Sequence, residues 1–130
     1  MLVSKIYLTV VAILYAYLAL WCSVSPQITS EKVGFERIGD TGRSEFLTVY
    51  GGLEMGLALV FLLPWLNSQH TTTALWACAL VHGCLVLFRS ISLWMFPKVA
   101  PLTHQLSIGE WVIFVSSVIL LVVYHRTKAA

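Results

Sequence analysis

Long apolar runs separated by short polar segments make up most of this chain. A helix rising 1.5 Å per residue needs roughly 20 apolar residues to cross a hydrocarbon core of about 30 Å. Four runs reach this length, and they cover residues 6–24, 46–66, 73–94 and 108–124. The pattern predicts an all-α protein, a bundle of four transmembrane helices, in which residues 1–130 form a single integral membrane domain.

The segments between the runs differ in character. Residues 25–45 form a polar, charged loop with room for a short surface helix, residues 67–72 form a tight turn, and residues 95–107 contain two prolines. Tryptophan and tyrosine are typical of the membrane–water boundary. They occur near the predicted span ends at Trp21, Trp65, Trp94, Trp111 and Tyr124. The first run resembles a signal peptide but lacks a small-residue cleavage site, so we expect an uncleaved span.

The composition supports a membrane protein and excludes several other classes. Of the 130 residues, 58% are hydrophobic and 11% are charged, against about 25% charged residues in an average soluble domain. A net charge of +2 without a basic block argues against nucleic-acid binding. The three cysteines lie inside apolar runs and have no zinc-ligand spacing, so we expect neither a metal nor another cofactor.

Four spans place both termini on the same side of the bilayer. Lys5, Arg126 and Lys128 flank that side, whereas the basic residues of the 25–45 loop lie on the other side among several acids. Acidic residues count little in the positive-inside rule, and the bias favours termini in the cytoplasm. We therefore expect a multi-pass protein of a bacterial inner membrane, with the lipid bilayer as its first partner.

Few ionisable side chains lie within the predicted spans. Each lies on a helix face that is more polar than the rest of its helix, and we expect that face to turn toward the interior of the bundle. Glu54, His82, Arg89 and Glu110 each have other polar or small residues at steps of three, four or seven. Ionisable groups in lipid are expensive and turn toward one another. Helix lengths place Glu54, Arg89 and Glu110 in the same half of the bilayer, with Glu110 at the rim. We predict an interior cluster of these three, with Tyr50 and His82 as further partners.

Simpler interpretations of these residues remain open. Arg89 and Glu110 could extend their side chains to the headgroup level. Glu54 could form a salt bridge that only fixes helix packing, or it could bind a ligand or a proton. A lone His82 is more often a hydrogen-bonded packing residue than a ligand.

Small and aromatic residues add further expectations. Gly52 and Gly56 form a small-xxx-small pair on nearly the opposite face from Glu54. Such a pair predicts close helix packing, either against the first helix or against another subunit. Tyr7, Tyr15 and Tyr17 supply hydroxyl groups to the first helix, and we expect them to be rim and packing aromatics.

A short motif resembles a known family. The stretch Arg43…Tyr50-Gly-Gly-Leu-Glu54-Met-Gly56, the pair Phe88-Arg89 and Glu110 resemble small bacterial four-span membrane proteins that are known only as a domain of unknown function. The resemblance covers roughly residues 40–115. It implies the bundle and the polar cluster but no activity. The third helix here ends in Leu-Trp-Met-Phe-Pro97, where an acidic-glycine turn is expected.

Three functions compete on this evidence. The first is a non-catalytic membrane protein whose interior cluster holds the bundle or binds a small amphipathic ligand or lipid, alone, as a homo-oligomer or in a larger membrane complex. The second is a proton-coupled small-molecule transporter that acts as an oligomer. The third is a lipid isomerase or hydrolase that uses Glu54 and His82 as an acid–base pair. No nucleophile with a base at usable spacing is evident, which disfavours an enzyme.

Overall fold

The computed structural model describes residues 2–129, and all regular secondary structure in that range is helical. The segments are α1 (Leu2–Val24), α2 (Pro26–Lys32), α3 (Gly39–Leu47), the π-helical η1 (Thr48–Leu53), α4 (Glu54–Leu66), α5 (His70–Met95) and α6 (Pro101–Ala129). Since α3, η1 and α4 are continuous, the chain has four rods long and apolar enough to cross a membrane. The predicted all-α bundle of four membrane-spanning helices is confirmed.

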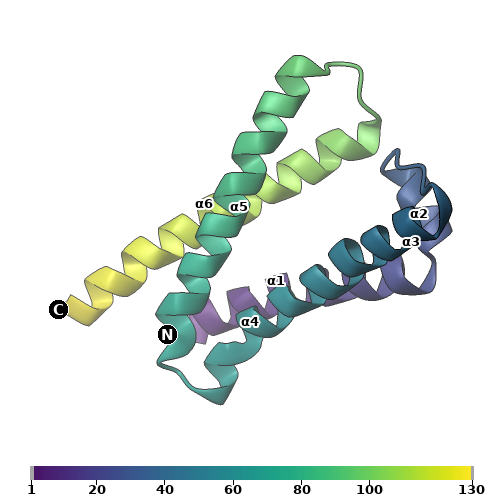
Figure 1. Ribbon diagram of the computed structural model, residues 1–130. Coiled ribbons are helices and arrows are strands. Elements are labelled where there is room, and N and C mark those ends of the chain that lie inside the picture. The colour runs from purple at the N-terminus through teal and green to yellow at the C-terminus, as the bar shows by residue number, and fades with distance from the viewer. Residues whose placement is uncertain (1, 130) are drawn as a thin grey trace.

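The four rods are arranged as two antiparallel hairpins. α1 packs mainly on α4, and α5 packs mainly on α6. Figure 1 shows α5 beside α4 near the turn that joins them and diverging from α4 toward its far end. Both termini lie at the end of the molecule that holds this turn (Figure 1), where Lys5 Nζ donates a 2.8 Å hydrogen bond to Ser68 Oγ. At the far end of the first hairpin, α2 and the start of α3 lie over the end of α1 (Figure 1).

The helices extend beyond the predicted apolar runs. The second rod begins at Gly39 rather than at residue 46, and the last begins at Pro101 rather than at residue 108. Hydropathy marks only the part of a helix that suits hydrocarbon, whereas helical hydrogen bonding continues into polar flanks. Proline suits the first position of a helix because its fixed φ is already helical and it lacks an N–H. Pro101 and Pro26 both occupy that position.

The charged segment 25–45 forms a compact cap that includes the short helix α2. Arg37 Nε donates a 3.0 Å hydrogen bond to Ser30 Oγ, and the guanidinium lies 5.7 Å from the ring centroid of Phe46. Lys32 Nζ lies 4.8 Å from the centroid of a Trp21 ring. These contacts join the cap to the ends of α1 and of the second rod.

Mostly apolar side chains from three helices form the core between the hairpins. Fully buried members come from α1, α4 and α5, and they include Leu8, Ala12, Phe61, Leu75 and Cys78. Most large apolar side chains of the outer faces remain exposed. In lipid that exposure costs nothing, so the outward apolar faces fit a multi-pass membrane protein.

Candidate functional site

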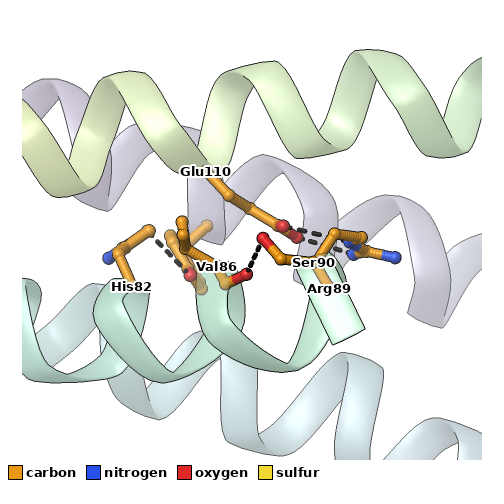
Figure 2. A network of polar contacts seen from close by, with 6 residues as sticks. His82, Val86, Arg89, Ser90 and Glu110 are labelled. Carbon is orange, nitrogen blue, oxygen red and sulfur yellow. Dashed lines mark hydrogen bonds and ion pairs between the residues drawn. The ribbon is translucent and has the colours of Figure 1, made fainter. Parts of the chain in front are cut away.

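An ion pair joins the two helices of the second hairpin. Arg89 on α5 donates from Nη2 to Glu110 Oε1 at 2.6 Å and from Nε to Glu110 Oε2 at 3.0 Å. Figure 2 shows the two side chains reaching toward each other between the helices. Side-chain exposure is 28% for Arg89 and 14% for Glu110, so the pair is largely inside the protein. Two parallel bonds fix the orientation of the planar guanidinium, which a single contact would not do.

Helix packing explains why Glu110 reaches Arg89. Gly83 on α5 leaves space for the ring of Phe114, whose Cε2 lies 3.0 Å from where a Cβ on Gly83 would be. Glu110 precedes Phe114 by one turn, so the close contact at Gly83 holds it near α5. It lies nine residues after Pro101, about 14 Å along α6, and therefore not at the start of the helix as predicted.

Glu54 lies in the other hairpin and does not share this ion pair. Within residues 2–129, no hydrogen bond joins Glu54 to Arg89, whose bonds go to Glu110. The Oε2 atom of Glu54 is buried, and it has no hydrogen-bond partner among the residues that the structure describes. Of the predicted cluster, the structure brings Arg89 and Glu110 together and leaves Glu54 unbonded at this oxygen.

The π-helical segment η1 ends directly before Glu54. A π-helix places residues five apart on one face, where an α-helix places residues three or four apart. Accordingly, Phe46 and Gly51 are both buried, whereas Leu47, which lies seven residues before Glu54 and would share its face in a regular α-helix, is 47% exposed. The one-residue offset lies within the Tyr50-Gly-Gly motif, so the buried face of α3 is shifted by one residue from the face that a regular α-helix would give.

His82 lies at the centre of the bundle and forms its hydrogen bonds with Cys78 and Tyr15 rather than with the predicted cluster. Its Nδ1 lies 2.8 Å from the carbonyl oxygen of Cys78, an atom that can only accept. His82 Nδ1 therefore bears the proton in the neutral ring, and Nε2 is an acceptor. The hydroxyl of Tyr15 on α1 lies 3.1 Å from Nε2 and donates to it. Both ring nitrogens of His82 are thus satisfied by the protein.

Two tyrosines of α1 belong to this interior polar network, although we expected them to be rim or packing residues. Tyr15 is buried, and Tyr7 donates a 2.7 Å hydrogen bond to the carbonyl of Ile113 on α6 and lies 3.7 Å from Cys78 Sγ. Position along the helix could have identified Tyr15. It lies 13 residues after Leu2, about 20 Å along α1 and far from either rim. A hydroxyl at that depth needs a partner.

Tyr50 and the glycines have packing roles that differ from those predicted. Tyr50 stacks on Phe46 with centroids 4.6 Å apart, beneath the cap. A Cβ on Gly52 or Gly56 would meet nothing within 4 Å, so neither packs against α1 in this chain. Gly51 makes that contact instead, because a Cβ there would lie 2.6 Å from Ser23 Oγ. For Gly52 and Gly56, only the subunit alternative stays open.

No group of three or more His, Cys, Asp or Glu side chains able to hold a metal ion occurs in the described part of the chain. Searches for related proteins do not add a function. No family model, no curated protein and no solved structure matches this sequence.

Proposed function

We propose that this protein is a non-catalytic multi-pass membrane protein that binds a small amphipathic ligand at Glu54. The Arg89–Glu110 pair holds α5 against α6. The observation that supports ligand binding is the buried Oε2 of Glu54, which lacks a hydrogen-bond partner among the side chains that the structure describes. Leaving such a group unpaired inside a membrane protein costs free energy, and a bound ligand would recover it.

Position supports the same proposal. Glu54 lies 12 residues before Leu66, or about 18 Å along α4, which is near the middle of a hydrocarbon core about 30 Å thick. An ionisable residue at that depth is a functional-site candidate by default.

Native mass spectrometry of gently solubilised protein tests the proposal. The wild type should retain a small bound molecule or lipid that Glu54→Gln loses, while Glu45→Gln, which changes an exposed acid, retains it. The same spectrum reports whether the protein forms a homo-oligomer or belongs to a larger membrane complex. An adduct-free wild-type spectrum, with full helicity by circular dichroism, would contradict the ligand-binding proposal.

A proton-coupled transporter is the second candidate, favoured by a carboxyl group near mid-membrane that no base of the described chain pairs with. A transporter would exchange a proton on Glu54 for its ligand. Ligand binding by the wild type should then change between about pH 5 and pH 9 and become independent of pH in Glu54→Gln. The isomerase receives no such support, because both nitrogens of His82 are occupied.

We assign the protein to a bacterial inner membrane with both termini in the cytoplasm, since Lys5 and Arg126 flank the terminal side. A fluorescent protein fused to the C-terminus should then fold and fluoresce. Full expression without fluorescence, together with activity of a C-terminal alkaline phosphatase fusion, would reverse the assignment.

A further inference from the structure

Two side chains hold Lys5 at the rim of the bundle where both termini lie. The ammonium group of Lys5 donates a 2.8 Å hydrogen bond to Ser68 Oγ in the turn before α5, and it lies 5.2 Å from the centroid of a Trp65 ring at the end of α4. Trp65 is fixed in turn, because its Nε1 donates a 2.6 Å hydrogen bond to Thr9 Oγ1, one turn after Lys5 on α1. A flexible lysine is thereby held where three segments of the chain meet.

No acidic side chain in the described part of the chain neutralises this ammonium group. The ion pairs among residues 2–129 join Arg43 to Asp40 and Arg89 to Glu110. The six acids of the sequence are Glu31, Glu36, Asp40, Glu45, Glu54 and Glu110. The first four belong to the cap at the far end of the first hairpin (Figure 1), and Glu54 lies about 18 Å along α4 from Leu66. Lys5 therefore has a fixed position but no counter-ion.

The hydroxyl group of Ser68 supplies a second donor beside Lys5. Since Ser68 Oγ accepts its hydrogen bond from Lys5, its own hydrogen is left to donate, and no other partner within residues 2–129 bonds to this oxygen. An ammonium group has three donors, of which Ser68 takes one. Because Lys5 lies at the rim, where water and headgroups solvate it, the group keeps its charge. A charged oxygen group that can accept several hydrogen bonds complements this arrangement.

Exposed apolar side chains continue from Lys5 toward the middle of the membrane. Ile6 and Ile13 lie within about 60° of Thr9 around α1, and they are 52% and 64% exposed. Ile13 is eight residues after Lys5, about 12 Å deeper along the helix. An anion bound at Lys5 that also has acyl chains would place those chains against an apolar helix face.

We propose that this rim binds an anionic phospholipid, whose phosphodiester accepts hydrogen bonds from Lys5 and Ser68 and whose acyl chains lie along α1. A zwitterionic phospholipid has a cation of its own, for which no acid is present at this rim. A headgroup with net negative charge instead balances the basic residues of this end, Lys5 and Arg126. The site is separate from Glu54, so this inference does not depend on the proposed ligand.

Native mass spectrometry with added lipid tests the site. Delipidated protein in an uncharged detergent is titrated with phosphatidylglycerol and with phosphatidylcholine of the same acyl chains. The wild type should bind its first phosphatidylglycerol about tenfold more tightly than phosphatidylcholine, and Lys5→Gln should abolish this preference. Lys5→Arg should keep most of it, because the charge remains. Ser68→Ala should reduce it about threefold, because one neutral donor is lost.

Lys98→Gln is the matched control. It removes the same charge from an exposed position at the opposite side of the membrane, and it should bind both lipids like the wild type. Inorganic phosphate in large excess, compared with chloride at matched ionic strength, distinguishes the lipid from a free anion. It should leave phosphatidylglycerol bound, because it has no acyl chains to replace those along α1.

Each other outcome would overturn the proposal. Equal binding of the two lipids by the wild type, or an unchanged preference in Lys5→Gln, would show that Lys5 selects no headgroup. An equal loss in Lys5→Gln and Lys98→Gln would assign the preference to net charge rather than to a site. Displacement of the lipid by inorganic phosphate would assign the site to the free anion. If Lys5→Gln does not fold, Ser68→Ala decides, and a preference equal to that of the wild type would refute the site.

Discussion

Arg89 and Glu110 meet through two hydrogen bonds, 2.6 Å and 3.0 Å long, across the interface of α5 and α6. α6 is the least buried of the four rods. This pair, the contact of Phe114 with Gly83 and the hydrogen bond from Tyr7 to the carbonyl of Ile113 all help to hold it. The ion pair is therefore a structural element of the hairpin, separate from the unpaired acid Glu54.

Removing one partner of this pair should destabilise the protein more than removing both. Arg89→Met leaves the Glu110 carboxylate inside the hairpin without its partner, and we expect a loss of about 3–5 kcal/mol. Arg89→Met with Glu110→Leu should recover most of that loss, because no charge is left. The stability loss of Arg89→Lys should lie between those of the single and the double variant, since an ammonium group cannot make both hydrogen bonds. The measurement is unfolding in increasing SDS, followed by circular dichroism. Equal losses in the single and the double variant would contradict a buried ion pair.

The bond between Tyr15 and His82 can be isolated by a matched pair of variants. Tyr15→Phe keeps the ring but removes the hydroxyl that donates to His82 Nε2, and we expect a loss of about 1–3 kcal/mol from the unpaired nitrogen. Tyr17→Phe is the control, because Tyr17 is 58% exposed on the same helix. The same SDS titration compares them. Similar stabilities for both variants would show that His82 does not depend on Tyr15.

Gly51 and Gly52 should respond in opposite ways to alanine. Gly51→Ala places a methyl group 2.6 Å from Ser23 Oγ and should cost about 1–3 kcal/mol. Gly52→Ala meets nothing within 4 Å and should be neutral or stabilising, because alanine favours helix. Combining Gly51→Ala with Ser23→Ala removes the clashing oxygen and should restore much of the stability. A Gly51→Ala protein as stable as the wild type would refute the close approach of the first and second rods.

The four helices and one residue pair of the candidate site, Arg89 and Glu110, could be predicted from the sequence. Apolar runs long enough to span a bilayer leave few alternatives to four helices, and Arg89 and Glu110 face inward because each lies on the polar stripe of its helix. Which helices pair most closely cannot be inferred from stripes. Here α5 and α6 form one hairpin, and Glu110 within that hairpin forms the ion pair with Arg89. Glu54 belongs to the other hairpin.

Two further residues show where periodicity fails. Tyr15 was assigned to packing because tyrosine is common at membrane rims, although its depth along α1 required a hydrogen-bond partner. Phe46 is buried in place of Leu47 because an extra residue in η1 shifts the helical face, which steps of three and four cannot represent.

The extra residue of η1 has a consequence for how this chain tolerates changes in length. Deletion of Gly52, whose surroundings are open, can convert the π-helical turn to an ordinary α-turn while both flanking helices keep their orientation. Deletion of Leu59 in the regular helix α4 would instead rotate everything on one side of it by about 100°. A membrane-spanning rod is normally intolerant of such gaps. In this protein, η1 (Thr48–Leu53) is the segment in which evolution could delete one residue while the helices of the bundle keep their packing.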